Sequence, residues 1–131
     1  MSLPKFDHPF SVDELQAVIH ALDKGRADKV YVIDVREDFE VDAVPPLPQA
    51  TVIPMRDLEK ALNMWGSDFQ REYNAKKPGK KDRIVLYALN ARRAMSASSI
   101  MNALGYKYAV CLADTFAEYM ERTQGKLDED L

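Results

Sequence analysis

Six residues between an apolar run and an amphipathic run are suited to binding an anion: Ala88, Leu89, Asn90, Ala91, Arg92 and Arg93. A helix that starts directly after a strand leaves its first N–H groups without partners. These groups, together with the positive end of the helix dipole, favour a negative ligand. Arg92 and Arg93 add formal positive charge at the same place. The sequence therefore predicts an anion-binding loop at residues 88–93.

Position 88 stands where the strand meets the loop, which is where an enzyme of this layout holds its nucleophile. Ala88 carries only a methyl group there, and a methyl group has no lone pair with which to attack a substrate. We expect an anion loop without a catalytic residue of its own.

This stretch resembles the rhodanese family of single-domain sulfurtransferases, whose strand ends in a catalytic cysteine followed by a loop of the type Cys-Arg-x-Gly-x-Arg-Ser. On that pattern Ala88 takes the place of the cysteine, Ala91 that of the glycine, Arg93 that of the arginine and Ala94 that of the serine. The resemblance also covers the loop length, because six residues are typical of the sulfurtransferases, whereas related phosphatases of the same fold have one more.

The resemblance extends from about Ser11 to Met120. Val30 to Arg36 looks like the family's strand ending in Asp-Val-Arg. Residues 45–54 match only part of the family's Gly-His-Ile-Pro-Gly-Ala stretch, and Leu112 to Phe116 stands where the family has Leu-Glu-Gly-Gly-Ile. Four signature elements have changed together, which argues against an active enzyme altered by one engineered Cys→Ala substitution.

The resemblance to an enzyme family and the alanine at position 88 together suggest a rhodanese-like pseudoenzyme, used for binding or regulation. Its ligand would be sulfate, thiosulfate or phosphate, or a protein partner at the mouth of the former pocket. The alternative is a divergent thiosulfate sulfurtransferase that uses a thiol from another molecule, or Cys111. Cys111 lies in an apolar run, where cysteines are usually inert and buried. A phosphatase-like function is a third possibility, disfavoured by the short loop and the missing thiol.

The two arginines also have an ordinary explanation, since they can pair with a carboxylate such as Asp114 or Glu37 instead of holding an anion. Alanine at position 91 resists the left-handed backbone that the family's glycine permits, by roughly 1 to 2 kcal/mol, so the loop is expected to be partly collapsed. A serine hydrolase is not expected, because the candidate serines lie within a helix and His20 lies on another. The Pro-x-x-Pro pattern at 45–48 is interpreted as a stiffened loop, with docking to a polyproline-binding domain as the alternative.

Composition narrows the class of protein. The chain has 131 residues, of which 47% are hydrophobic, and this suits one domain. Its net charge of −3 disfavours nucleic acid, and no stretch is apolar enough for a membrane span or a signal peptide. One cysteine excludes an intrachain disulfide and, with two histidines, makes a poor zinc site. We expect a cytoplasmic protein with no metal and no cofactor.

Apolar spacing and capping signals predict an α/β domain of three layers, with a central, mostly parallel sheet and helices on both faces. Residues 1–10 are a leader, residues 11–124 the domain and residues 125–131 a frayed acidic tail. Strands are predicted at 30–35, 50–53, 83–87 and 108–112, and the proline-containing stretch 36–49 is a loop. Helices are predicted from a cap at Ser11 to about Gly25, over 56–65, from a cap at Ser67, over 92–104 and from a cap at Thr115.

Overall fold

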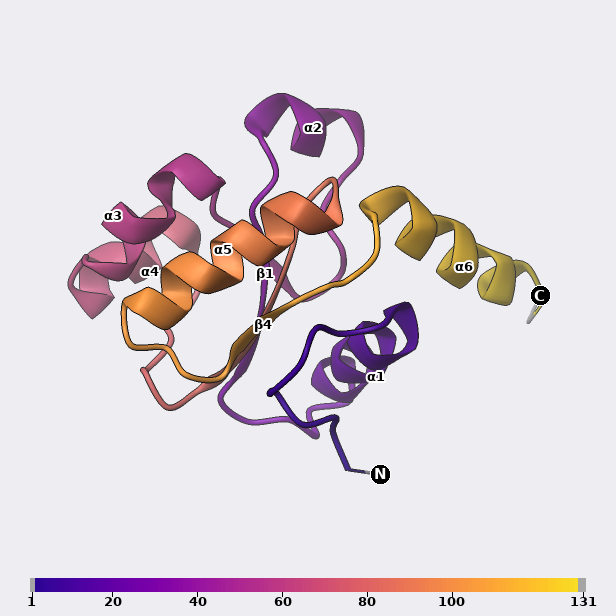
Figure 1. The fold of residues 1–131 in the computed structure, drawn as a ribbon, viewed down its shortest axis with the longest axis horizontal. Helices are drawn as coiled ribbons and strands as arrows, with labels where there is room; N and C mark the ends of the chain where they lie inside the picture. The colour runs from indigo at the N-terminus through magenta and orange to yellow at the C-terminus, as the bar shows by residue number, and fades with distance from the viewer. Residues whose placement is uncertain (1, 130–131) are drawn as a thin grey trace.

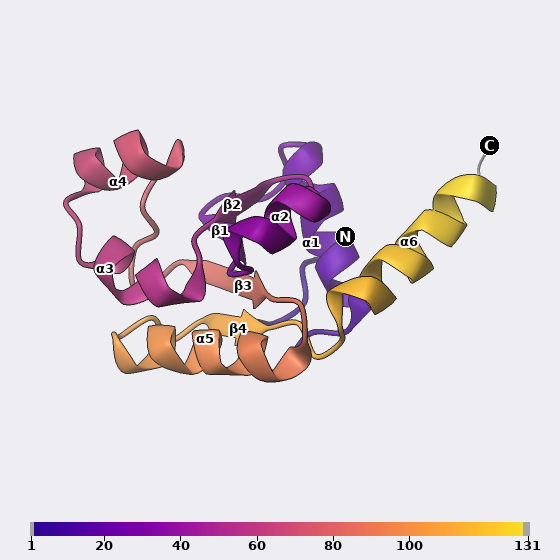
Figure 2. The same ribbon diagram turned by 90° about the horizontal axis from the view of Figure 1, so that it is seen from above.

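The computed structural model describes residues 2–129, which form a four-stranded parallel sheet covered by helices on both faces (Figures 1 and 2). The strands are β1 (Val30–Asp34), β2 (Ala50–Val52), β3 (Arg83–Tyr87) and β4 (Ala109–Cys111), in the spatial order β2-β1-β3-β4. The helices are α1 (Val12–Asp23), α2 (Asp38–Ala43), α3 (Leu58–Leu62), α4 (Gly66–Tyr73), α5 (Ala91–Ala103) and α6 (Phe116–Glu129), with a 3-10 turn at Met55–Asp57. The predicted three-layer α/β class is confirmed.

Two apolar cores lie on opposite faces of the sheet. Ile33 and Leu86 point into a core shared with α3, α4 and α5, whereas the neighbouring Val32 and Val85 point into a core shared with α1 and α6. Side chains alternate between the faces of a strand, so a central strand that is covered on both sides must be apolar at nearly every position. This explains the uninterrupted apolar runs of β1 and β3.

The register of the two central strands places the functional loop. Asp34 of β1 stands opposite Tyr87 of β3 at the carboxyl end of the sheet. The next residue, Ala88, leads directly into the loop before α5, and α2 lies at the same end (Figure 1). The carboxyl ends of parallel strands are where α/β folds place their ligand sites.

Some of the predicted boundaries are wrong. The stretch 36–49 was predicted to be a loop because it contains three prolines. All three follow the last residue of α2, so they do not prevent a helix at Asp38–Ala43. The predicted cap Ser67 lies inside α4, whose N-cap is Trp65. Helix α6 is described as far as Glu129, and residues 130–131 of the predicted tail lie outside the described residues.

The leader packs on the domain. Phe6 and Phe10 are buried in the core under α1 and α6. The Phe10 N–H donates to the Cys111 carbonyl at 2.7 Å, and the Phe10 carbonyl accepts from the Ala113 N–H at 2.8 Å. The leader therefore supplies backbone partners to β4, which would otherwise be an open edge.

Candidate functional site: the loop at residues 88–93

The loop joins the buried end of β3 to the start of α5. Ala88 is 1% exposed and belongs to the core, whereas Leu89 and Asn90 are exposed. Asn90 has an extended backbone, and its side-chain Oδ1 accepts the N–H of Arg93 at 2.9 Å. Asparagine is among the best N-cap residues because its side-chain oxygen reaches a first-turn N–H group in this way. Helix α5 therefore begins at Ala91, one residue before its predicted start.

The loop keeps open hydrogen-bond donors. Among residues 2–129, no acceptor is recorded for the backbone N–H groups of Leu89, Asn90, Ala91 and Arg92. The predicted strain at Ala91 does not arise, because Ala91 is helical. The non-glycine residues of positive φ in the described chain all lie elsewhere. Strain at Ala91 was therefore the wrong reason for expecting a partly collapsed loop.

Arg93 is held by a carboxylate other than the two that the sequence suggested. Its Nη1 lies 3.5 Å from both carboxylate oxygens of Glu40 on α2. Of the suggested partners, Glu37 pairs with Arg56, and Asp114 lies 4.0 Å from Arg122. Arg93 therefore pairs with a carboxylate of the protein itself, which was the alternative to holding an anion.

Arg92 differs from its neighbour. Its side chain is exposed, and no carboxylate partner is recorded for it within the described residues. It is therefore the cation of the loop that remains available to a ligand from solution.

Glu40 is a site residue that the sequence interpretation missed. Its side chain is 7% exposed, and besides contacting Arg93 it accepts the N–H of Glu37 at 2.8 Å. It thus caps the start of α2 and joins that helix to the start of α5. The spacing of Glu37 and Glu40, three residues apart, is the capping-box spacing and was the available signal for both the helix and the residue.

A buried polar cluster of Asp34, Arg36 and Tyr87, which we call the floor, lies at the carboxyl ends of β1 and β3, where the loop begins. The Arg36 guanidinium donates to both oxygens of Asp34, at 2.8 to 3.1 Å, and its backbone N–H donates to Oδ1 at 2.9 Å. The Tyr87 hydroxyl donates to Asp34 Oδ2 at 2.8 Å and accepts the Leu47 N–H at 2.9 Å. Burial and the adjacent Asp34 carboxylate raise the pKa of Tyr87, so the phenol stays protonated and remains a donor. Asp34 and Arg36 therefore have a structural role, because their charges are paired with each other in the interior.

The first residue of α6 closes this floor. The Arg36 guanidinium carbon lies 4.0 Å from the centre of the Phe116 ring, which in turn stacks on Tyr87 at 5.5 Å and 7°. The backbone N–H of Phe116 donates to the carbonyl of Leu89 at 3.2 Å. Position 116 lies in the stretch that departs from the family pattern, and here it supplies an aromatic cover for a buried cation.

Cys111 does not lie in the loop. It is 3% exposed in the middle of the core under α5, where its thiol interacts with Ser98. Ser98 is seven residues beyond Ala91, which places it about 10 Å along α5 from the open N–H groups at 1.5 Å per residue. Burial raises the pKa of the Cys111 thiol, and this disfavours the reactive thiolate.

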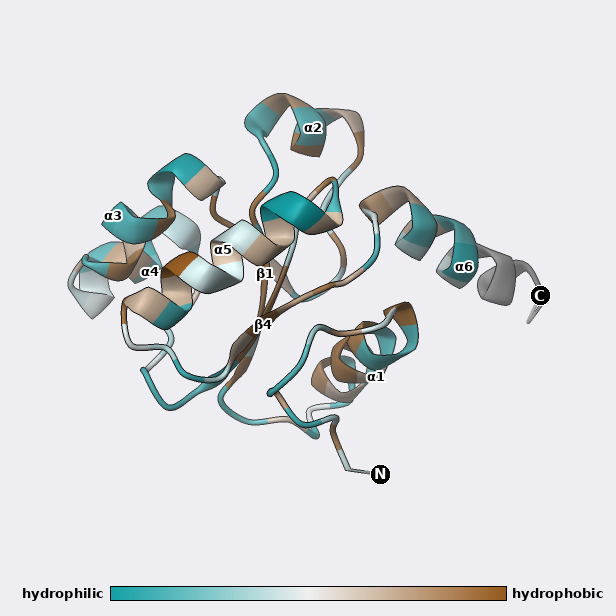
Figure 3. Cartoon of the chain, in the orientation of Figure 1, coloured by the Kyte–Doolittle hydropathy of each residue, from teal (hydrophilic) through white to brown (hydrophobic). Residues whose placement is uncertain are grey.

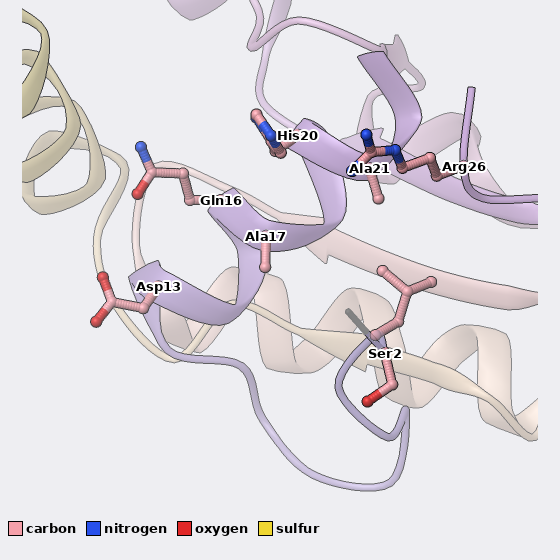
Figure 4. Close-up of a pocket in the computed structure, with 8 residues that line it drawn as sticks. Ser2, Asp13, Gln16, Ala17, His20, Ala21 and Arg26 are labelled. Carbon is pink, nitrogen blue, oxygen red and sulfur yellow. The ribbon is translucent and has the colours of Figure 1, made fainter. Parts of the chain in front are cut away.

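The predicted absence of a serine hydrolase site can be examined at His20. This side chain lines a cavity of about 350 Å³ between α1 and the leader, together with Ser2 and Asp13. Figure 4 shows that these three side chains point in different directions and do not converge. Ser98 lies on α5 and donates to the Met95 carbonyl at 2.9 Å. No Ser-His-carboxylate arrangement is formed among these residues.

Two large apolar side chains are exposed at the carboxyl end of the sheet. Phe39 on α2 is 72% exposed, and Leu89 in the loop is 44% exposed. Phe39 directly precedes Glu40, which contacts Arg93, and Leu89 lies two residues before α5. The described residues contain no group of three side chains suited to a metal ion, and none of their helices is long and apolar enough to cross a membrane.

Comparison with known proteins places this geometry in a family. The family model for the rhodanese-like domain matches residues 13–122 of this chain. Human thiosulfate:glutathione sulfurtransferase is 34% identical over 113 residues, which cover 86% of this chain and 92% of that protein. A rhodanese domain-containing protein of Drosophila melanogaster, CG4456, is 32% identical over 93 residues, covering 71% of this chain and 84% of that protein.

Solved structures agree with this result. The human single-domain sulfurtransferase TSTD1 superposes with a TM-score of 0.75 at 33% identity, over 86% of this chain and 95% of that one. The Saccharomyces cerevisiae single-domain sulfurtransferase RDL2 superposes with a TM-score of 0.73 at 20% identity, over 93% of each chain. With its parallel sheet, its loop at the start of α5 and alanine at the position that resembles the family's catalytic cysteine, this chain belongs to the rhodanese-like domain family.

Proposed function

We propose that this protein is a rhodanese-like domain without sulfurtransferase activity of its own, which binds an anion and a protein partner at the 88–93 loop. The observation that carries the proposal is the side chain of Ala88, at the position that resembles the family's catalytic cysteine. Sulfur transfer in this family needs a thiolate that accepts the sulfane sulfur as a persulfide. A methyl group offers no acceptor.

The position of Cys111 supports the inactive reading. A substitute nucleophile would have to reach the substrate held by the loop. Cys111 is buried beside Ser98, about two helical turns from the loop, and burial raises the pKa of its thiol. Both the position of the thiol and its raised pKa disfavour a sulfurtransferase in which Cys111 is the nucleophile.

The open donors support the anion site. Within the described residues, four backbone N–H groups have no recorded acceptor and the exposed Arg92 side chain has no carboxylate partner, and all of them lie at or just before the start of a 13-residue helix. Arg93 contributes less to binding, because Glu40 already offsets its charge. Sulfate, thiosulfate and phosphate share the negative oxygens that such a site binds.

The exposed side chains of Phe39 and Leu89 support a protein partner at the same place. Large apolar groups that flank a polar site are typical of an interface core. A partner that carries an acidic or phosphorylated residue beside apolar ones would satisfy both features of the loop.

Activity is tested with thiosulfate and cyanide, by measuring thiocyanate. The purified protein should give no turnover above the rate without protein, and Cys111→Ser should give the same result. Turnover that persists after dialysis and is lost in Cys111→Ser would overturn the proposal.

Ala88→Cys provides the complementary measurement. If the open N–H groups still form a functional cradle, this variant should gain transferase activity, whereas the same substitution at an exposed site, Ala113→Cys, should not. Equal activity in both variants would contradict the role assigned to the loop.

The anion site is tested by thermal unfolding in sodium sulfate. A ligand at ten times its Kd stabilises the folded state by about 1.4 kcal/mol, which corresponds to a rise in Tm of several degrees for a domain of this size. Arg92→Ala should reduce the rise, and Lys60→Ala, which removes an exposed cation on α3, should not. Absence of a rise in all three proteins at tens of millimolar sulfate would remove the anion from the proposal.

The second candidate is a divergent thiosulfate sulfurtransferase in which another molecule supplies the thiol. The donors of the loop favour it, as do the relatives named as sulfurtransferases, one of them as thiosulfate:glutathione sulfurtransferase. In an assay with thiosulfate and glutathione, consumption of thiosulfate that depends on Arg92 would favour this candidate over the first.

A further inference from the structure

The amino end of the sheet, opposite the 88–93 loop, gathers an unusual excess of positive charge. The segments before β1, β3 and β4 meet there, since the Arg83 N–H donates to the Lys29 carbonyl at 3.1 Å and the Ile84 N–H donates to the Tyr108 carbonyl at 3.0 Å. In Figure 1 these segments and the leader form the lower margin of the molecule. Figure 3 shows hydrophilic colouring along the loops before β1 and β3.

Charge is segregated toward this end. It carries six cationic side chains, Lys5, Lys29, Lys80, Lys81, Arg83 and Lys107, against three carboxylates, Asp7, Asp28 and Asp82. The whole chain has a net charge of −3, so the remainder of the molecule is acidic. No ion pair of any of the six cations with a carboxylate is recorded within the described residues.

Two of the three carboxylates already have partners. Asp82 accepts the N–H of Gly79 at 2.7 Å, which closes the turn before β3. Asp7 lies 2.7 Å from His8. Both carboxylates keep their negative charge, and the six cations exceed the three carboxylates of this end by three positive charges.

A hollow of about 440 Å³ opens within this surface. Its polar lining includes three cations, Lys5, Lys81 and Arg83, and one carboxylate, Asp7, which lies beside His8; its apolar lining includes Phe6 and Tyr108. Tyr108 is 46% exposed. The Arg83 guanidinium donates to the Asp28 carbonyl at 3.5 Å and lies 5.9 Å from the centre of the Phe6 ring, so it is held at the wall of the hollow.

We propose that this hollow docks an acidic segment of a partner protein, with carboxylates against Lys5, Lys81 and Arg83 and an apolar side chain against Tyr108. Within the described residues, the three cations of the hollow form no ion pair, and they lie beside an exposed aromatic ring. Such a combination matches a peptide that alternates acidic and apolar residues.

A nucleic acid or an anionic membrane fits this surface less well. Nucleic acid binding at physiological salt relies on many phosphate contacts. Here only three cations line the hollow, apolar residues make up part of its lining, and the rest of the molecule is acidic and would repel an extended polyanion. A short acidic peptide needs only the hollow itself.

The experiment measures fluorescence anisotropy of a fluorescein-labelled peptide of the repeating sequence Glu-Glu-Leu-Glu-Glu-Phe, titrated with the full chain at low salt. The chain should bind it, and the analogue with glutamine in place of every glutamate should not bind. The double variant Lys5→Glu, Lys81→Glu should weaken binding by about tenfold or more, because each reversal replaces an attraction by a repulsion. The matched control Lys60→Glu changes charge on the exposed face of α3 and should leave the Kd within about twofold.

Tyr108→Ala tests the apolar half of the site and should weaken binding by about fivefold or more. Circular dichroism of each variant verifies that it is folded. Equal affinity for the glutamate and glutamine peptides, or equal losses in the Lys60 control and the double variant, would overturn the proposal. Tighter binding of a single-stranded oligothymidine or of phosphatidylserine vesicles than of the acidic peptide would assign the surface to a different class of partner. None of these measurements depends on the 88–93 loop, so their outcome is independent of the function proposed for it.

Discussion

The Tyr87 hydroxyl provides the sharpest test of how the floor of the site is held together. It donates to Asp34 Oδ2 at 2.8 Å and accepts the Leu47 N–H at 2.9 Å, and the tyrosine is fully buried. Tyr87→Phe removes only this oxygen. The Leu47 N–H loses its acceptor, which costs about 1 to 3 kcal/mol for a buried donor. Asp34 keeps the donors of Arg36, so its own loss is smaller, about 1 kcal/mol.

The expected decrease in the free energy of unfolding is therefore about 2 to 4 kcal/mol. Urea unfolding followed by circular dichroism measures it. With a slope near 2 kcal/mol per molar urea, the midpoint should fall by about 1 to 2 M without a change in slope. Amide hydrogen exchange supplies a local readout, since the Leu47 N–H should lose protection more than the amides of β3.

Tyr119→Phe is the matched control. Tyr119 is also buried, at 4% exposure, but no hydrogen bond of its hydroxyl is recorded in the described residues. This substitution should change stability by less than about 0.5 kcal/mol. If Tyr87→Phe were no more costly than Tyr119→Phe, the reasoning from hydrogen bonds of the floor would be refuted.

Three further predictions concern the cap, the thiol and the leader. Asn90→Ala should lower the free energy of unfolding by about 1 kcal/mol in urea titrations, because it removes the side-chain acceptor of α5; an unchanged midpoint would contradict the capping role. Cys111 should react with a thiol-specific disulfide reagent far more slowly in the native than in the urea-unfolded protein, because it is buried and its pKa is raised; equal rates would show that the thiol is accessible. Hydrogen bonds with Asp7 and Glu14 raise the pKa of His8 above its ordinary 6.5. The stability from these bonds is present below that value and is lost as the pH rises through the raised pKa. The Tm difference between the wild type and His8→Gln should thus be larger near pH 6 than near pH 9, and a difference independent of pH would disprove the link.

Local signals predicted the elements that depend on local physics. The capping box of Ser11 and Glu14 correctly marked the start of α1, and both of its hydrogen bonds are present. The predicted cap Thr115 accepts the Glu118 N–H at 3.0 Å before α6. The apolar run of β3 matched its bounds at both ends, because a strand covered on both faces leaves a pattern in the chain itself.

The features that the sequence did not reveal depend on contacts between distant residues. Arg93 meets Glu40 across 53 positions of sequence, and its partner lies on a six-residue helix hidden before a proline-containing loop. No local pattern states which of several glutamates will reach a given arginine. The strand, the loop and the following helix were located because they are consecutive in the chain. The carboxylate partner of Arg93 was wrongly predicted because it lies far away in the sequence.

The backbone hydrogen bond from Phe116 to Leu89 makes the exposed loop and the last helix mechanically one piece. A molecule that binds α6 and tilts it must either break that bond or move Leu89, which directly precedes the open N–H groups of the loop. If the proposed anion binds there, tilting of α6 and occupancy of the loop become coupled equilibria, each of which changes the other.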